Sequence, residues 1–206
     1  MRIAIVGGTG PFGTALATRL REAGHAIVIG SRDAERAAAA AIDLGVEGAT
    51  NEAAVRSADV VVLATKAEAA LETARDLREA IDATPVLSVA SELRFEDGRA
   101  RPSPEAASLA ERIQNEVNAP VLAGLHSLAA STLGGEQAPD EDAFVCGDDA
   151  DAKALVLELA EQITAGRALD AGPLASARAL EGMTAVIVNL NKRYRGHAGL
   201  RVVGLP

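Results

Sequence analysis

A short segment near the start of the chain contains three glycines in the spacing G-x-G-x-x-G. In this spacing the first glycine permits a tight turn, the second lets the backbone approach a pyrophosphate, and the third lets a helix pack closely on a strand. Unpaired N–H groups at the start of that helix then attract the anion. The spacing predicts a dinucleotide-binding loop made of Gly8, Thr9, Gly10, Pro11, Phe12 and Gly13.

The residues around this loop decide how much weight the glycines carry, because a glycine-rich turn alone is common. An apolar run precedes the loop at residues 3–6, and an amphipathic segment with Leu16 and Leu20 on one side follows it. Gly24 ends that segment, and a second apolar run occupies residues 26–29. This order of strand, loop, helix and strand favours a dinucleotide-binding unit over a purely structural turn.

The end of the second predicted strand distinguishes NADP from NAD. An NAD site needs a carboxylate here for the ribose 2′-hydroxyl. This chain instead has Ser31 and Arg32, with Arg36 one helical turn later. Arginine pairs bidentately with phosphate, so these residues suit a 2′-phosphate and predict NADP. The alternative is that both arginines are solvated charges at a helix start, where Asp33 and Glu35 partly offset their unfavourable interaction with the helix dipole.

Polar residues also follow three later apolar runs. Thr65 and Ser91 follow the runs at residues 60–64 and 85–89, and His126 follows another. Ligands of open α/β sheets bind beyond the carboxyl ends of the strands, so Thr65 and Ser91 are candidate cofactor contacts and His126 is the candidate catalytic residue. A hydrogen-bonded structural histidine is the alternative. No Asp or Cys has the spacing that would make His126 part of a nucleophilic triad.

The elements that must hold these residues alternate along the chain. Helical patterns at residues 34–44, 67–80 and 151–163 are separated by apolar strands. This alternation predicts an α/β fold with a doubly wound, mostly parallel sheet and a small C-terminal extension of helix and strand. A long apolar helix at residues 176–190 predicts core packing or a subunit interface, and hence a homodimer.

Less regular segments give weaker predictions. Gly98 and two prolines predict a loop over residues 95–104, followed by a helix over residues 104–117 that Ser103 caps. Asn51 is the predicted N-cap of a short helix. The basic cluster near the C-terminus is consistent with a helix end or with an anionic ligand, and it consists of Lys192, Arg193 and Arg195.

Composition excludes several classes of partner and site. The chain has 206 residues, a net charge of −9 and a pI of about 4.9. This balance argues against nucleic acid or an anionic membrane as a partner. The single cysteine, Cys146, excludes an intrachain disulfide and a cysteine-cluster metal site, and Asp148 and Asp149 are better explained as helix caps, so no metal is predicted. Without a signal-peptide pattern or an apolar run long enough to span a bilayer, we expect a cytoplasmic protein.

The chain also resembles a known family, the NADPH-dependent reductases of coenzyme F420, also called F420:NADP oxidoreductases. The resemblance covers most of the chain. Its motifs begin at Gly7 (G-G-T-G), Gly30 (G-S-R), Val145 (V-C-G-D-D), Asp170 (D-A-G-P-L) and Asn191 (N-K-R-Y-R-G-H-A-G-L). The last three motifs are much more specific than the first two.

The resemblance implies hydride transfer between C4 of the NADP(H) nicotinamide and C5 of the deazaflavin coenzyme F420. Residues 1–125 would form the NADP-binding domain, and residues 126–206 a smaller part that completes the deazaflavin pocket and the subunit interface. The resemblance assigns NADP contacts to Thr9–Phe12, Ser31, Arg32, Arg36, Thr65 and Ala130, and deazaflavin-pocket positions to the His126 segment, Ala198 and Gly199.

Such a reaction needs stacked rings and exclusion of water, and it needs no protein nucleophile. The missing triad and metal set therefore agree with it. Two alternatives remain open. An NADP-linked reductase of a small carbonyl or imine would need a proton donor, for which His126 is the best candidate. A regulatory protein would bind NADP(H) and transfer hydride to nothing.

Overall fold

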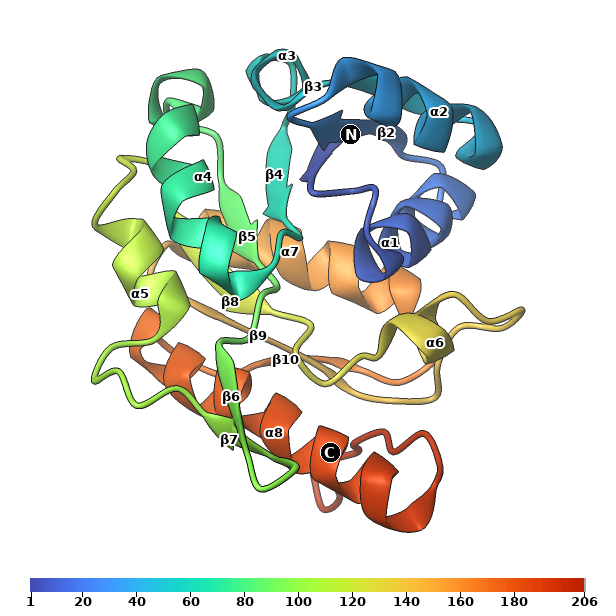
Figure 1. Cartoon of the computed structure of the whole chain (residues 1–206), viewed down its shortest axis with the longest axis vertical. Coiled ribbons are helices and arrows are strands. Elements are labelled where there is room, and N and C mark those ends of the chain that lie inside the picture. The colour runs from blue at the N-terminus through green and yellow to red at the C-terminus, as the bar shows by residue number, and fades with distance from the viewer. Residues whose placement is uncertain (206) are drawn as a thin grey trace.

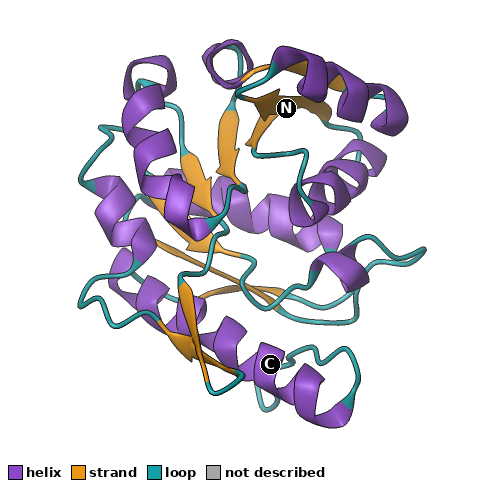
Figure 2. Cartoon of the chain, viewed as in Figure 1, coloured by secondary structure: helices purple, strands orange, loops and turns teal. Residues whose placement is uncertain are grey.

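The computed structural model describes residues 1–205 and consists of one large sheet with helices on both faces (Figures 1 and 2). Within these residues the sheet has eight strands, and a separate hairpin has two. In spatial order the strands are β10 (Ala168–Asp170), β9 (Ala143–Gly147), β8 (Val121–Gly124), β5 (Val86–Ser88), β4 (Val60–Leu63), β1 (Arg2–Val6), β2 (Ala26–Ser31) and β3 (Glu47–Thr50). The α/β fold predicted from the sequence is confirmed.

Six neighbouring strands, from β8 to β3, run parallel, whereas β9 pairs antiparallel with β8. β10 then pairs parallel with β9. The prediction of a mostly parallel sheet is therefore confirmed. The direction of β9 matters for function, because the carboxyl ends of β9 and β10 point to the opposite edge of the sheet from those of the other strands.

Alternating residues of the central strands face two apolar layers. Ile3 and Ile5 of β1 pack in the layer formed with α1 (Pro11–Glu22) and α7 (Ala150–Ile163). Ala4 and Val6 pack in the layer on the other side. The helices of that second layer are α3 (Asn51–Arg56), α4 (Ala67–Ile81), α5 (Leu109–Gln114) and α8 (Ala177–Tyr194). Burial on both faces explains why the strands read as continuous apolar runs.

The loop predicted at residues 95–104 is wrong, because β6 (Leu93–Glu96) and β7 (Arg99–Pro102) form an antiparallel hairpin beside α8 (Figure 1). The turn between them is Asp97-Gly98, and both residues have positive φ angles, 49° and 72°. An Asp-Gly pair in that conformation suits the right-handed twist of a hairpin. Pro102, the last residue of β7, is tolerated because a two-stranded ribbon consists of edge strands only, and Pro104 lies outside the hairpin.

Two predicted helix starts are also wrong. α5 begins after Ser108, which forms a capping box with Glu111, rather than after Ser103. The reciprocal bonds of that box satisfy backbone groups that Ser103 does not reach. α3 is capped by Thr50, whose hydroxyl accepts from the N–H of Ala53, so Asn51 is the first residue of the helix. The predicted helix at 34–44 is confirmed as α2 (Ala34–Leu44).

Candidate cofactor-binding site

The residues singled out from the sequence lie in a row along one edge of the sheet. They follow the carboxyl ends of the parallel strands in the order β2, β1, β4, β5 and β8. The groups in the row are Ser31 with Arg32, the glycine loop, Thr65, Ser91 and His126. Four strand spacings separate β2 from β8, so the row is roughly 19 Å long. A row of this length accommodates an extended dinucleotide and the ring of a second ligand.

The glycine loop requires glycine where the backbones are closest. A Cβ atom at Gly13 would lie 2.6 Å from the Cα of Gly8, so a side chain there would force α1 away from β1. Gly10 differs, because a Cβ there would meet only the carbonyl oxygen of Gly7 at 3.5 Å. The surface over Gly10 is therefore open, as close approach by a phosphate requires.

The start of α1 is a site for an anion. Pro11 occupies the first turn, no acidic residue lies in that turn, and the N-cap Gly10 has no side chain to bond the free N–H groups. Within residues 1–205, the backbone N–H groups of Phe12 and Gly13 have no hydrogen-bond partner. An unneutralised helix dipole and free donors favour a phosphate group here.

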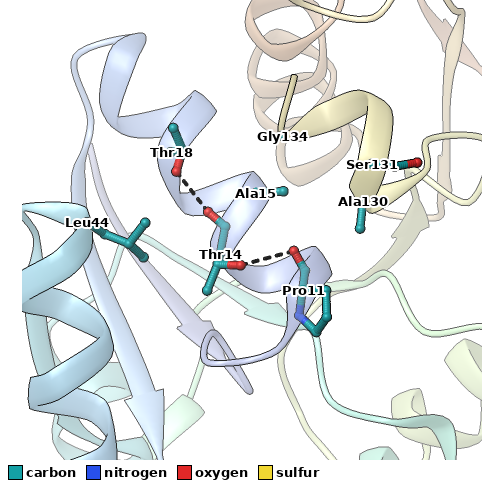
Figure 3. Close-up of a pocket in the computed structure, with 8 residues that line it drawn as sticks. All are labelled: Pro11, Thr14, Ala15, Thr18, Leu44, Ala130, Ser131 and Gly134. Atoms are coloured by element: carbon teal, nitrogen blue, oxygen red, sulfur yellow. Dashed lines mark hydrogen bonds between the residues drawn. The ribbon is translucent and has the colours of Figure 1, made fainter. Parts of the chain in front are cut away.

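An open cleft of about 540 Å³ lies beside this helix start (Figure 3). Residues of α1 face α6 (Ala130–Leu133) across it, and Leu44 closes a further side. Arg19 of α1 ties the segment after α6 in place, because its guanidinium donates to the carbonyl oxygens of Leu133, Gly135 and Gln137. This brings Ala130, predicted as a cofactor contact, opposite the glycine loop.

The end of β2 presents free cations. Arg32 and Arg36 are exposed, and neither forms an ion pair with a carboxylate within the described chain. Asp33 is engaged elsewhere, since its carboxylate caps α2 by accepting from the N–H groups of Glu35 and Arg36. The hydroxyl of Ser31 accepts from the N–H of Asp33. Two guanidinium groups and a hydroxyl therefore remain available at the strand end.

Two buried polar oxygens near this edge lack partners. The hydroxyl of Thr65 and Oδ1 of Asn51 have no hydrogen-bond partner within residues 1–205. Thr65 lies against Gly7, and Asn51 lies against Gly30, where added Cβ atoms would come within 2.9 Å of them. Buried polar groups normally find partners, so both oxygens fit contacts to a bound ligand. Asn51 was missed as a site residue, because the sequence suggested only a helix cap.

His126 is buried at the end of the row. Its exposed fraction is 5%, and neither ring nitrogen has a hydrogen-bond partner in the described chain. The backbone of Ala90 lies close enough to influence the ring, so the catalytic role and the structural role of His126 both stay predictions. Burial lowers the pKa of His126 to about 4, and the backbone of Ala90 opposes part of this shift. The imidazole is consequently neutral at physiological pH.

This pKa predicts a pH-dependent stability. The folded-state pKa is about 4, whereas that of the unfolded chain is about 6.5. Between these values the unfolded chain binds more protons, so the free energy of unfolding falls on acidification, by up to about 1.4 kcal/mol per pH unit. Urea unfolding at pH 6.5, 5.5 and 4.5 measures this slope. The variant His126→Asn should have a flatter slope and the exposed-residue control His197→Asn an unchanged one. An equal slope in wild type and His126→Asn would contradict the lowered pKa of His126 in the folded protein.

Ser91 is joined to the His126 segment through α8. Its hydroxyl lies 2.7 Å from the hydroxyl of Thr184, which in turn donates to the carbonyl oxygen of His126 at 3.1 Å. The ends of β5 and β8 are thus connected by a residue that the sequence did not indicate.

The C-terminal segment closes the same edge. The N–H of Asp142 donates to the carbonyl oxygen of Leu200 at 2.7 Å, and its carboxylate accepts from the N–H of Val202 at 2.7 Å. Asn191 holds Ala198 through a hydrogen bond, and Gly199 packs on Glu141. Ser127 bonds the carbonyl oxygen of Asp142 at 2.9 Å, which links the tail to the His126 segment. The structure therefore brings Ala198 and Gly199 to the region of His126.

Other candidate residues have structural roles or none. Asp149 caps α7, as predicted, and Asp148 accepts from the N–H of Leu174. Cys146 is buried. Lys192 donates to the carbonyl oxygen of Gly98 in the hairpin, whereas Lys66 is exposed before α4.

No group of three metal-ligating side chains occurs within residues 1–205. In the same residues, no helix is both long and apolar enough to cross a membrane.

Comparison with known proteins places this geometry in a family. Residues 2–92 match the model described as NADP oxidoreductase, coenzyme F420-dependent. The chain is 40% identical over its full length to a protein from Methanothermobacter thermautotrophicus named F420-dependent NADP reductase, and it covers 96% of that protein. The chain belongs to the F420-dependent NADP reductase family. A relative of the same name from Methanocaldococcus jannaschii is 34% identical, with 100% of this chain and 99% of the relative covered.

Solved structures agree with membership of the F420-dependent NADP reductase family. A structure described as that of a proposed F420-dependent NADP reductase from Arthrobacter sp. FB24 has a TM-score of 0.87 and 25% identity, and the match covers 99% of this chain and 100% of the other. An imine reductase from Streptomyces aurantiacus shares the fold, with a TM-score of 0.65 and 22% identity over 95% of this chain and 62% of its own.

The motifs on which the resemblance to F420-dependent NADP reductases was based are divided between the two edges of the sheet. The motifs beginning at Val145 and Asp170 include the last residues of β9 and β10 and continue past their carboxyl ends. They lie on the edge opposite the glycine loop, where the N–H of Gly147 donates to the carbonyl oxygen of Gly172. Asp149 of the first motif caps α7, and Asp148 accepts from the N–H of Leu174 in the second, so both motifs make contacts that stabilise the fold. The motif beginning at Asn191 leads into the tail beside His126, so it belongs to the site edge.

Proposed function

We propose that this protein transfers hydride between NADP(H) and coenzyme F420, reversibly, as its relatives' names indicate. The single observation that carries the proposal is the row of ligand-directed groups from Arg32 to His126, supported by full-length relatives that share one name. The residues present fit a dinucleotide, because the helix start, the unpaired arginines and the orphaned Thr65 oxygen each offer a partner that the chain itself does not use. The bound rings would supply the hydride donor and acceptor carbons.

The chain's own contribution is to bind, orient and exclude water. The loop of α1 would hold the pyrophosphate, and Ser31, Arg32 and Arg36 the 2′-phosphate. Thr65, Ser91 and Ala130 would line the path toward the nicotinamide. His126, Ala198 and Gly199 would line the deazaflavin pocket. Precise positioning of this kind can supply most of the rate of a direct transfer.

His126 would act as a neutral imidazole, since burial keeps its pKa at about 4. A neutral ring offers one N–H donor and one acceptor, so it can bond the deazaflavin and stabilise charge that develops on that ring without carrying a formal charge. Neither ring nitrogen has a hydrogen-bond partner within the described chain. A bound ligand would therefore supply a missing hydrogen bond and would not have to replace an existing one.

The proposal also covers the domains of the chain, its assembly into a dimer and its location in the cell. Residues 1–125 would form the NADP-binding domain, and residues 126–206 would complete the deazaflavin pocket and a homodimer interface. Exposed apolar side chains on the hairpin and α8 support a subunit contact there, since Phe95 is 67% and Tyr194 is 72% exposed. The enzyme would be cytoplasmic and act on small molecules, and its net charge of −9 argues against a nucleic-acid or anionic-membrane partner.

The test is to mix the purified protein with NADPH and oxidised coenzyme F420 and to follow the deazaflavin absorbance. We expect bleaching that requires NADPH and is much weaker with NADH. His126→Ala should lower turnover and deazaflavin affinity together and leave NADPH affinity unchanged. NADPH binding without bleaching would refute the reaction. In that case a reductase of a carbonyl or imine, or an NADP-sensing regulator, would take its place.

A further inference from the structure

Three oxygens form a chain between the two halves of the site edge. They are the hydroxyls of Ser91, after β5, and Thr184, in α8, and the carbonyl oxygen of His126, after β8. The Ser91 and Thr184 oxygens are 2.7 Å apart, and the Thr184 and His126 oxygens are 3.1 Å apart. Thr184 is separated from its two partners by 93 and 58 residues, so the chain exists only in the folded protein.

The direction of these hydrogen bonds follows from counting protons. A carbonyl oxygen only accepts, so Thr184 must donate its single hydroxyl proton to His126. Thr184 then has none left for Ser91, and Ser91 must donate its own proton to Thr184. Ser91 has consequently used its only donor. Its two oxygen lone pairs can only accept.

We propose that Thr184 is a positioning residue that makes Ser91 an obligate hydrogen-bond acceptor for an amide or imide N–H of a bound ligand. The inference rests on the proposed function and deepens it. Ser91 is half-buried and follows β5, between Thr65, which follows β4, and His126, which follows β8. It therefore lies where the row passes from the predicted dinucleotide contacts to the predicted deazaflavin contacts. Thr184 also fixes the backbone that carries His126.

Two ligand groups have the required chemistry. The carboxamide of a nicotinamide carries N–H donors, and the pyrimidine part of a deazaflavin carries a ring imide N–H. An acceptor-only hydroxyl favours either of them and disfavours a group without an N–H, because a ligand without a donor would displace water from Ser91 and offer no hydrogen bond in return. The two sources are distinguished by which ligand loses affinity when the acceptor is removed.

The experiment measures ligand Kd by fluorescence quenching, separately from turnover, for wild type, Ser91→Ala, Thr184→Val and Thr184→Ser. Thr184→Val keeps the branched shape and removes the hydroxyl, and Thr184→Ser keeps the hydroxyl. We expect Ser91→Ala and Thr184→Val to weaken one ligand by about 5- to 10-fold, the effect of one net hydrogen bond. Thr184→Ser should restore wild-type affinity. Thr73→Val, at a half-buried position in α4, is the matched control for a threonine change within a helix.

Ligand analogues give the decisive comparison. If the nicotinamide carboxamide is the donor, the 3-acetylpyridine analogue of NADPH, which has no N–H there, should bind Ser91→Ala and wild type equally. If the deazaflavin imide is the donor, the same equality should hold for an N-methylated deazaflavin. Equal losses for the parent ligand and its analogue, or no rescue by Thr184→Ser, would overturn the proposal. Wild-type bleaching tests the proposed function independently, so the two failures are distinguishable.

Discussion

Replacing Arg32 and Arg36 together by alanine is expected to weaken NADPH binding by about 100-fold or more and to leave NADH binding unchanged. Each guanidinium is exposed and makes no ion pair with a carboxylate within the described chain, so its full hydrogen-bonding capacity is available to a ligand. A hydrogen bond to a charged group contributes about 1.5–3 kcal/mol, and two such bonds account for this loss. NADH has no 2′-phosphate, so removing the two guanidinium groups takes no hydrogen bond from it.

The measurement is Kd for both cofactors by titration of their fluorescence, at two salt concentrations because exposed charges are screened. A charge-matched control is the double variant of Arg21 and Arg78, which lie in the last turns of α1 and α4. These helices return antiparallel to their strands, so their last turns lie at the opposite edge of the sheet. A similar loss of NADPH affinity in the control would mean that net charge, and not the β2 site, selects the cofactor.

The part of the site that could be predicted from sequence depends on local patterns. The glycine loop, the β2 end and the residues after β4, β5 and β8 follow from two facts: apolar runs end at particular residues, and parallel strands end at one edge. Gly13 needs no tertiary information, since its closest neighbour, Gly8, is five residues away. The hairpin turn was also within reach, because Asp97-Gly98 is a known hairpin pair that the neighbouring prolines obscured.

The rest of the site depends on contacts between distant segments. In the sequence, Thr184 is one residue of an apolar helix. Its contacts to Ser91 and His126 exist only once α8 packs over the ends of β5 and β8. Asn51 has the sequence pattern of a helix cap, and only the packing of Gly30 of β2 against it shows its place near the site. The antiparallel direction of β9 has no local signal, since its sequence is as apolar as that of a parallel strand. For this reason the family motif beginning at Val145 could be recognised without knowing that it lies on the opposite edge.

The tail that carries Ala198 and Gly199 depends on one buried carboxylate, which leads to the second large expected effect. Asp142 has no exposed surface, and its oxygens accept from the side chain of Arg167 at 2.7 Å and from the N–H of Val202 at 2.7 Å. Replacing Asp142 by alanine removes the carboxylate partner of the Arg167 cation and the acceptor of two backbone N–H groups, those of Arg167 and Val202. Because the Arg167 side chain is 35% exposed, the cost should lie at the lower end of the range for a buried pair, about 3 kcal/mol. For a domain of this size the melting temperature should fall by roughly 10 °C.

The same change should release the tail, weakening coenzyme F420 binding and sparing NADPH binding, because the glycine loop and the β2 end lie at other strands. Asp140→Ala is the matched control, since Asp140 is exposed and pairs with Arg201 on the surface, where an ion pair contributes no more than about 1 kcal/mol. If Asp142→Ala lost both ligands equally, the effect would be global unfolding rather than release of the tail.

Acid provides an independent measurement of the same interaction. The Arg167 hydrogen bond holds the pKa of Asp142 well below its usual range, and the unfolded-state pKa is about 3.9. The carboxylate's contribution to stability is therefore complete above about pH 4 and is lost as pH falls toward the folded-state pKa. Wild-type protein should lose stability below pH 4 more steeply than Asp142→Asn, which has no proton to bind there. Parallel acid-unfolding curves would show that Asp142 does not hold the tail through its charge.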